Sequence, residues 1–222
     1  MKRIQIKVCG LTEAKTAQAC AALGIDAVGL VFYAKSPRFV SDSRAAEIAA
    51  AVAGKVAVVG VFVDEASDVI MEKVRRCHLT AVQLHGQEPP ADITRLKHAG
   101  LTVIKGLFQA GEPTFDRTDV YDPTAFLVEC GRGRLPGGNA RTWDWSATRR
   151  IQTDKPLIIA GGLSPANVDR AISLGQPDAV DVSSGVETAP GIKDLDRIKA
   201  FLAAVRGTAP TGANQKARRI FQ

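Results

Sequence analysis

The chain has 222 residues and a mass of 23.5 kDa, a size that suits one α/β barrel used as a single domain. Hydrophobic residues make up 45% and charged residues 23% of the chain, and these ordinary values exclude disordered, collagen-like and coiled-coil proteins. The net charge of +6 is partly local, because the segment 208–222 holds Lys216, Arg218 and Arg219 and no acidic residue. Since the other basic residues are scattered and aromatic residues are only 5%, nucleic acid is not an expected partner.

The cysteines and the apolar runs indicate the cellular compartment. No two cysteines have Cys-x-x-Cys spacing and the chain has only three histidines, so no metal site is expected. The cysteines are Cys9, Cys20, Cys77 and Cys130. Residues 1–7 alternate charged and apolar side chains, and the longest apolar run, 48–63, is split by Lys55 and too short to span a bilayer. We therefore expect reduced thiols, no membrane partner and a cytoplasmic location.

Short runs of β-branched residues recur at fairly even intervals and predict eight strands. In chain order they cover residues 4–8, 27–32, 56–61, 81–84, 102–105, 126–128, 157–159 and 179–182. Apolar residues with helical spacing, such as Ile70 and Val74, lie between most of these strands. The exception is 109–123, where Gly111 and Pro113 interrupt any long helical period, so the fifth crossover is expected to be short or irregular.

Turn residues predict where several helices begin and end. Ser164 followed by Pro165 predicts the start of the helix after the seventh strand, with serine as the N-cap and proline at the first helical position. Gly175 is placed to end the same helix at the C′ position. Similar helix ends are predicted at Gly24, Gly100 and Gly207. These boundaries agree with a repeating unit of one strand followed by one helix.

The repeat predicts the fold class. Eight strand–helix units of about 26 residues need roughly 210 residues, which fits a single (β/α)8 TIM barrel with eight parallel strands. An open doubly wound sheet is the alternative, since it is built from the same units, but the number of strands favours the barrel. We expect the barrel domain in 1–207 and a basic, disordered C-terminal tail in 208–222.

The alternation of side chains along the strands predicts which residues face the barrel axis. In the first strand the apolar set that includes Val8 should face the helices, which places Lys7 and Cys9 inside, with Cys9 at the carboxyl-terminal mouth. The same alternation places the side chains of Glu129 and Asp181 on the faces of their strands that point toward the barrel axis. Barrel enzymes carry out their chemistry at this mouth, so these are candidate site residues. For Lys7, ordinary polar filling of the barrel interior is the preferred explanation.

Two glycine-rich turns follow the last two predicted strands. Gly161 and Gly162 follow the seventh strand, and Ser183, Ser184 and Gly185 follow the eighth. Each turn offers backbone N–H groups that no Cβ obstructs, beside the start of a helix or turn where partial positive charge favours a phosphate. Because the barrel fold commonly binds phosphate in these two loops, a phosphorylated small molecule is the expected ligand.

Six segments of the chain carry a family resemblance. They are KVCGLT at 7–12, SPRFV at 36–40, VGVFV at 59–63, VQLHG at 82–86, AGGL at 160–163 and DVSSGVE at 181–187. Together and in this order they resemble the phosphoribosylanthranilate isomerase family, over roughly residues 4–205. The resemblance implies an aldose–ketose isomerase of tryptophan biosynthesis that converts N-(5-phosphoribosyl)anthranilate into its 1-deoxyribulose phosphate isomer by an Amadori rearrangement, without cofactor or metal. It implies a phosphorylated, carboxylate-bearing substrate and a monomer or homodimer.

The resemblance also assigns the two reacting groups. It makes Cys9 the base that removes the C2 proton and Glu129 the acid at the ring oxygen, although the family usually has aspartate there. Ring opening needs an acid and enolamine formation needs a base, so the two groups must face each other across the mouth. Cys9 must be a thiolate, so its pKa must fall. The expected sources of the field that lowers it are Lys7 on the same strand face and the turn at 10–12. The extra methylene of Glu129 moves the acid relative to an aspartate, which can reduce the rate.

The remaining implied contacts hold the substrate. Arg38 corresponds to an arginine that the family places against the anthranilate carboxylate, a group that a planar guanidinium binds with two hydrogen bonds. Asp181 corresponds to a residue near a ribose hydroxyl, with an ion pair to the lysine of the first strand as the alternative. Gly138 and Asn139 are expected to contact phosphate, although Ala140 stands where the family usually has glycine.

Some polar residues near the predicted site have simpler interpretations. Asp144 is a rival acid, but its position just before Trp145 fits a helix cap. Gln83 is interpreted as polar filling of the barrel interior and His85 as a structural residue that faces the interior. The other cysteines are interpreted as buried apolar residues.

Three other functions are compatible with a barrel of this kind. A histidine-pathway isomerase performs a similar rearrangement, but that family has aspartate where Cys9 stands and resembles a two-fold repeat that this chain lacks. A non-catalytic or weakly active phosphate-binding barrel is suggested by Glu129 and Ala140. A metal-dependent epimerase is disfavoured, because His78 and His98 fall in or near the same strand–helix unit as the third histidine.

Overall fold

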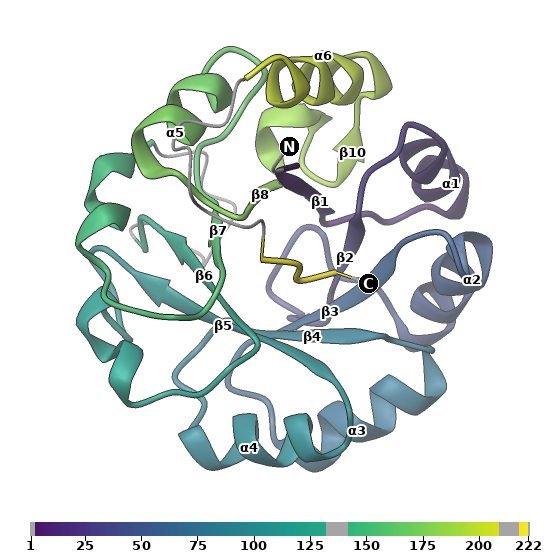
Figure 1. The fold of residues 1–222 in the computed structure, drawn as a ribbon. Helices are drawn as coiled ribbons and strands as arrows, with labels where there is room; N and C mark the ends of the chain where they lie inside the picture. The colour runs from purple at the N-terminus through teal and green to yellow at the C-terminus, as the bar shows by residue number, and fades with distance from the viewer. Residues whose placement is uncertain (1–2, 132–141, 209–217, 222) are drawn as a thin grey trace.

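A computed structural model of the chain describes residues 3–131, 142–208 and 218–221. Eight strands form a closed barrel in which every neighbouring pair is parallel, and the pairing of the first strand with the eighth closes it (Figure 1). The strands are β1 (Gln5–Cys9), β2 (Ala27–Val31), β3 (Ala57–Phe62), β4 (Ala81–Leu84), β5 (Thr102–Phe108), β6 (Ala125–Glu129), β7 (Leu157–Ile159) and β8 (Ala179–Val182). All eight predicted strands are confirmed, and the closed barrel excludes the open sheet.

Helices cover the outside of the barrel, but the fifth crossover and the described part of the sixth lack an α-helix. The α-helices are α1 (Ala14–Ala22), α2 (Asp42–Val52), α3 (Ser67–Arg76), α4 (Pro90–His98), α5 (Val168–Gly175) and α6 (Leu195–Gly207). The fifth crossover contains only the 3-10 turn η1 (Phe115–Asp119), as predicted, and the described part of the sixth contains only η2 (Trp145–Arg150), which was not predicted. Between β8 and α6 lie the short turn η3 (Ser184–Val186) and the hairpin strands β9 (Glu187–Ala189) and β10 (Ile192–Lys193).

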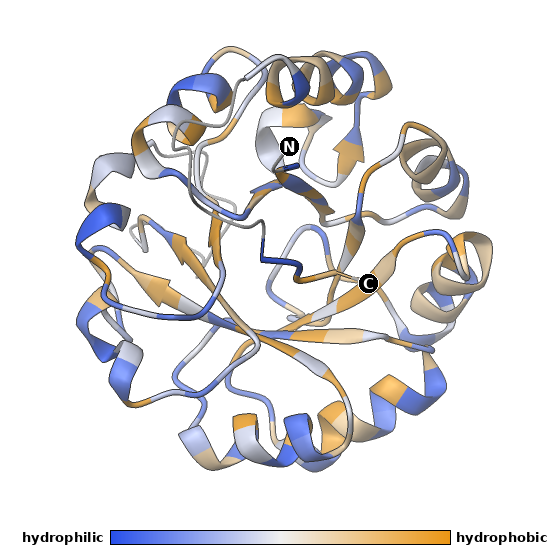
Figure 2. Ribbon diagram, in the orientation of Figure 1, coloured by the Kyte–Doolittle hydropathy of each residue, from blue (hydrophilic) through white to orange (hydrophobic). Residues whose placement is uncertain are grey.

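The main core lies between the barrel and its helices. Strand residues that point outward, such as Val8 and Val128, are fully buried against apolar helix residues such as Ile48 and Phe201. The strands are accordingly coloured as largely hydrophobic, whereas the helices carry hydrophilic residues on their outer turns (Figure 2). The inward positions of the same strands are therefore free to carry polar groups, and they include the fully buried Lys7.

The boundaries of α5 differ from the sequence prediction. The helix begins at Val168, because Ser164 and Pro165 form a preceding turn in which the Ser164 carbonyl accepts a hydrogen bond from the Val168 N–H at 3.1 Å. At the other end the left-handed residue is Gln176, with φ of 49°, and Gly175 is the last helical residue. A side chain at Gly175 would overlap the Ile159 side chain, so this glycine is explained by close packing against β7 rather than by its φ angle.

Residues 218–221 differ from the prediction of a disordered tail, because the structure places them against the barrel. Residues 209–217 and 222 lie outside the described residues, but Ile220 and Phe221 are buried, with 2% and 3% of their surface exposed. Gln5 holds them in place: its Oε1 accepts hydrogen bonds from the N–H groups of Ile220 and Phe221 at 2.7 and 3.2 Å, and its Nε2 donates to the Phe221 carbonyl at 2.9 Å. Arg218 forms an ion pair with Asp178 at 2.9 Å.

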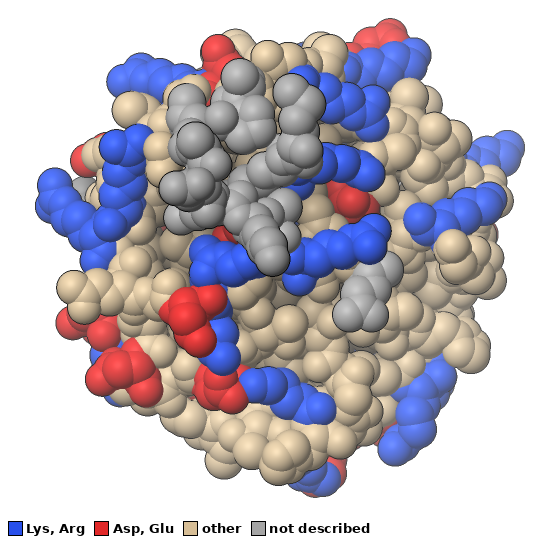
Figure 3. Space-filling view, in the orientation of Figure 1, with Lys and Arg blue, Asp and Glu red and all other residues tan. Residues whose placement is uncertain are grey.

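This segment closes the amino-terminal end of the barrel. Ile220 and Phe221 cluster with the alanines that begin five of the strands, and these small side chains leave room for the two larger ones. The alanines are Ala27, Ala57, Ala81, Ala125 and Ala179. Figure 1 shows the segment in yellow, running in across the barrel opening. In the space-filling view of the same face, basic side chains lie near the centre as well as at the rim, with acidic side chains between them (Figure 3).

Candidate active site

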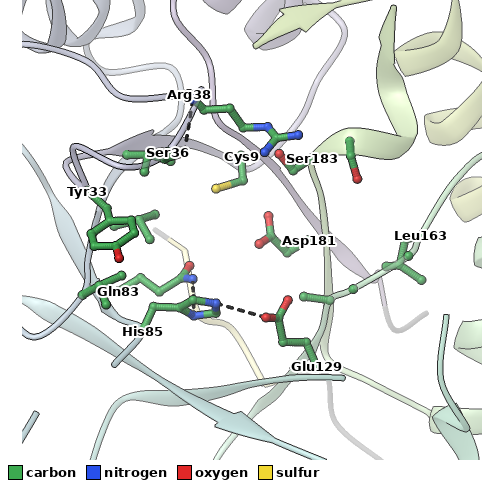
Figure 4. Close-up of a pocket in the computed structure, with 17 residues that line it drawn as sticks. Cys9, Tyr33, Ser36, Arg38, Gln83, His85, Glu129, Leu163, Asp181 and Ser183 are labelled. Carbon is green, nitrogen blue, oxygen red and sulfur yellow. Dashed lines mark hydrogen bonds and ion pairs between the residues drawn. The ribbon is translucent and has the colours of Figure 1, made fainter. Parts of the chain in front are cut away.

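A cavity opens at the carboxyl-terminal mouth of the barrel, the end opposite the buried tail. Most of the predicted site residues line it, namely Cys9, Arg38, Glu129, Gly161, Gly162, Asp181, Ser183 and Ser184. Figure 4 shows Cys9, Asp181 and Glu129 directed toward the same space. Gly185 does not line the cavity, and Gly138 and Asn139 lie outside the described residues, as does Ala140.

Cys9 lies beside a buried ion pair. Lys7 and Asp181 are paired across β1 and β8, and the Lys7 Nζ lies 3.0 Å from Asp181 Oδ2. Burial raises the pKa of the Cys9 thiol, and the ammonium group of Lys7 opposes this rise. Burial alone would lower the pKa of Lys7, but the Asp181 carboxylate and Cys9 together raise it, so the ammonium form is retained. Lys7 thus acts in the expected direction, but it does not bring the pKa of Cys9 below its ordinary value.

The pH dependence of thiol alkylation measures this balance. Because the pKa of Cys9 is raised, its thiolate fraction at neutral pH is small and grows as pH rises. Alkylation of Cys9 by iodoacetamide, followed by mass spectrometry, should therefore have a midpoint more alkaline than that of a free cysteine peptide. Lys7→Met removes the cation that opposes the rise, so it should move the midpoint further to alkaline pH, whereas the exposed Lys15→Met should not. A midpoint below that of the peptide would contradict the assignment.

Glu129 lies across the mouth of the barrel from Cys9 and forms a hydrogen bond with a histidine. It is 6% exposed at the end of β6, and its Oε1 lies 3.2 Å from His85 Nε2. The other ring nitrogen of His85 lies 3.1 Å from Gln83 Nε2, so the ring is fixed from both sides (Figure 4). The glutamate is therefore retained in the cavity rather than directed to solvent. His85 does face the interior, as the sequence indicated, but it also contacts the candidate acid and lines the cavity.

The two glycine-rich turns lie together on one side of the cavity. Gly161 and Gly162 have φ angles of +82° and +68°, and their N–H groups have no acceptor among the described residues. The Gly162 carbonyl accepts a hydrogen bond from the Asn167 side chain at 3.0 Å, which fixes the turn. A side chain at Gly185 would overlap the Leu163 carbonyl, so this glycine allows the two turns to pack together. The result is a set of free backbone donors suited to an anion.

Arg38 reaches the cavity from the loop after β2. It is only 6% exposed, and its guanidinium donates to the Glu187 carboxylate from Nε at 2.8 Å and from Nη2 at 2.7 Å. Lys193 donates to the same carboxylate at 2.6 Å. The sequence did not single out Glu187 or Lys193, although Glu187 ends one of the segments that carry the resemblance.

Other polar groups near the mouth have structural roles. Asp144 accepts a hydrogen bond from the Ser146 N–H at 3.0 Å at the start of η2, which confirms its interpretation as a cap. Among the described residues, no group of three or more histidine, cysteine, aspartate or glutamate residues could hold a metal ion. Within the same parts of the chain, no helix has the length and apolarity needed to cross a membrane.

The fold and the cavity together define a (β/α)8-barrel protein with a thiol, a carboxyl group and anion-binding turns at the mouth where barrel enzymes carry out chemistry. A family model described as N-(5'phosphoribosyl)anthranilate (PRA) isomerase matches residues 6–204. The chain belongs to this isomerase family.

Individual relatives agree with the family match. An N-(5'-phosphoribosyl)anthranilate isomerase from Desulfatibacillum aliphaticivorans is 47% identical over 218 residues, which are 98% of this chain and 99% of the relative. A crystal structure of phosphoribosyl anthranilate isomerase from Thermotoga maritima is 37% identical, covers 92% of this chain and 99% of its own, and has a TM-score of 0.82. Another structure of the enzyme, in complex with reduced 1-(o-carboxyphenylamino)-1-deoxyribulose 5-phosphate, is 36% identical with the same coverage and a TM-score of 0.79.

Proposed function

We propose that this chain converts N-(5-phospho-β-D-ribosyl)anthranilate into 1-(2-carboxyphenylamino)-1-deoxy-D-ribulose 5-phosphate, the Amadori rearrangement of tryptophan biosynthesis. The observation that carries the proposal is one cavity that is lined by Cys9, Glu129, Arg38 and the two anion-binding turns. The substrate carries the matching groups: an aromatic carboxylate for the arginine, a phosphate for the turns, and reacting sugar carbons for the acid and the base. Metal and cofactor have no part in this proposal.

In the first step Glu129 acts as the acid. It gives a proton to the ribose ring oxygen as the bond between this oxygen and C1 breaks, and the electron pair of the anilino nitrogen forms the C1–N double bond of the iminium ion. The hydrogen bond with His85 Nε2 keeps the carboxyl group in one orientation. General acid catalysis of this kind typically accelerates a reaction about 100- to 10,000-fold.

In the second step Cys9 acts as the base. Its thiolate removes the proton from C2, and the electrons of the broken C–H bond form the C1–C2 double bond while the iminium nitrogen regains its electron pair. The hydroxyl of the resulting enolamine then returns a proton to the Glu129 carboxylate, and C1 takes up the proton held by the Cys9 thiol, which gives the ketone and restores both residues with no net change in protons or electrons. A thiolate with a raised pKa is scarce but strongly basic, which suits removal of a carbon-bound proton.

Three contacts are proposed to hold the substrate. Arg38 binds the ring carboxylate, and the turns that contain Gly161, Gly162, Ser183 and Ser184 bind the phosphate, with Gly138 and Asn139 as further contributors. Asp181 is proposed to accept a hydrogen bond from a ribose hydroxyl, because its Oδ1 is buried with no hydrogen-bond partner among the described residues, while Oδ2 pairs with Lys7. The ion pair with Lys7 and the proposed hydrogen bond with a ribose hydroxyl use different oxygens of Asp181, so the two roles are compatible.

Turnover of the substrate by the wild-type protein tests the proposal. Purified protein should convert N-(5-phosphoribosyl)anthranilate into the ketose product in a buffer containing a metal chelator, with the product followed by chromatography. Binding of the reduced product analogue without turnover would instead support a non-catalytic phosphate-binding barrel. Turnover of the corresponding histidine-pathway aminoaldose in preference to this substrate would support the rival isomerase.

Glu129→Gln tests the acid separately. The amide keeps the size of the side chain but has no acidic proton for the ring oxygen, so kcat/KM should fall about 100-fold or more. Glu129→Asp, which has the residue usual in the family, should retain much more activity than Glu129→Gln. Steady-state kinetics of the three proteins measure the difference, and full activity of Glu129→Gln would exclude Glu129 as the acid.

We further propose that the barrel domain in 1–207, with residues 218–221 packed into its amino-terminal end, acts in the cytoplasm as a monomer or homodimer. The cytoplasmic location is supported by the cysteines, which are all free thiols: Cys9, Cys20, Cys77 and Cys130. One solved relative from Thermotoga maritima is described as a dimer from which monomers were generated. Sedimentation equilibrium of the purified chain distinguishes the two assembly states.

A further inference from the structure

Arg38 is held by a carboxylate on a different part of the barrel. Both oxygens of Glu187 on β9 accept hydrogen bonds from Arg38, one from Nε and one from Nη2, so the guanidinium cannot rotate about its long axis without losing both. The side chains of Arg38 and Glu187 are only 7% and 4% exposed. The aliphatic part of Arg38 packs against Gly10, where a side chain would overlap Arg38 Cδ. Arg38 is therefore fixed along its whole length.

The fixed guanidinium presents one free edge to the cavity. Because Glu187 uses the edge formed by Nε and Nη2, the edge formed by Nη1 and Nη2 remains available, and Nη1 has no acceptor among the described residues. Figure 4 shows this end of Arg38 in the cavity, near Cys9 and Ser183. An edge with two parallel N–H groups is complementary to a carboxylate.

Lys193 prevents Glu187 from cancelling the positive charge of this edge. Its ammonium lies 2.6 Å from Glu187 Oε1 and also contacts Ser183, at 3.2 Å from the carbonyl and 3.3 Å from Oγ. The cluster of Arg38, Glu187 and Lys193 has two positive charges and one negative charge, so a net positive charge remains beside the cavity. Hydrogen bonds from Arg38 and Lys193 outweigh burial and lower the pKa of Glu187, which keeps it ionised.

We propose that Glu187, braced by Lys193, is a positioning residue that orients Arg38 and thereby selects substrates with a carboxylate on the aromatic ring. The inference rests on the proposed function and extends it to residues that touch no reacting atom. Since Lys193 also contacts Ser183, the same cluster fixes the distance between the carboxylate end and the phosphate end of the cavity. If the cluster only anchored the β9–β10 hairpin, its loss would weaken the binding of ligands with and without the ring carboxylate equally.

The affinities of two ligands separate these roles. The first ligand is the reduced product analogue, and the second is the same compound without the ring carboxylate. In the wild type the carboxylate should strengthen binding. In Glu187→Gln the analogue with the carboxylate should bind about tenfold more weakly, because a free Arg38 must be ordered on binding, whereas the analogue without it should change less than about twofold. Glu187→Asp should restore part of the loss. Turnover should show a larger effect on KM than on kcat.

The controls make the result specific. Glu47→Gln removes an exposed glutamate that pairs with Arg44 on α2, and it should change neither affinity. Thermal unfolding shows whether each variant is folded. If Glu187→Gln does not fold, Lys193→Met provides a second variant of the same cluster. Equal weakening of both ligands, or tighter binding of the carboxylated one, with normal wild-type turnover overturns the role of Glu187 alone. A wild type that neither binds the analogue nor turns over the substrate overturns the proposed function and this inference together.

Discussion

Cys9→Ala is expected to lower kcat/KM by at least about 1000-fold, which corresponds to about 4 kcal/mol of transition-state stabilisation. Alanine has no group that can accept the C2 proton, and no other described residue that lines the cavity has a thiol. Steady-state turnover of N-(5-phosphoribosyl)anthranilate measures the loss. Affinity for the reduced product analogue should change little, because the methyl group leaves Arg38 and the phosphate turns in place.

Matched cysteine variants show whether the loss belongs to this thiol. Cys20→Ala and Cys77→Ala remove buried cysteines from α1 and from the end of α3, and both should retain nearly full kcat/KM. Cys9→Ser keeps a similar shape but its hydroxyl ionises far less readily, so it should be nearly as inactive as alanine. Retention of more than a tenth of the wild-type rate by Cys9→Ala would show that another group removes the proton.

The inward-facing site residues could be predicted because side-chain direction in a strand follows from local alternation. Once Val8 is assigned to the helix side, Lys7 and Cys9 must face the axis, and the structure places both there. The same reasoning succeeds for Glu129 and Asp181. Their chemical environment could not be predicted in the same way: burial raises the pKa of Cys9 despite the nearby lysine, and burial depends on the whole barrel.

Contacts between distant segments could not be predicted from local patterns. Arg38 and Glu187 are separated by 149 positions, and only the closed barrel brings their loops together. His85 similarly meets Glu129 across 44 positions. Each residue alone is compatible with an ordinary surface or interior position. The DVSSGVE segment was the only available signal for Glu187, and it did not reveal the partner.

The prediction of disorder failed for residues 218–221 because it was based on the basic residues of the tail and not on the two residues that follow them. Lys216, Arg218 and Arg219 suggested a solvated segment, but an apolar pair follows them. The complementary signal lay elsewhere, in the alanines that begin five strands and leave the amino-terminal end of the barrel underfilled. Local composition cannot relate these positions to each other, since Gln5 and Ile220 are 215 positions apart.

Phe221→Ala is expected to lower the free energy of unfolding by about 3 to 5 kcal/mol, the usual cost of removing a buried phenylalanine side chain. For a chain of this length each kcal/mol lowers Tm by about 2–4 °C, so the transition should move down by roughly 10 °C. Deletion of 218–222 should cost at least as much, because it also removes Ile220 and the three hydrogen bonds of Gln5. Urea unfolding and calorimetry measure both variants.

The exposed Arg219→Ala is the matched control, since it changes the same segment without removing buried surface and should leave Tm within about 1 °C. At 25 °C the folded fraction of Phe221→Ala should still turn over substrate at nearly the wild-type rate, because the tail closes the end of the barrel opposite the cavity. A loss of stability without a loss of kcat would establish that the last residues act as a plug for the barrel. An unchanged Tm for both Phe221→Ala and the deletion would show that the segment does not contribute to the fold, whatever its position.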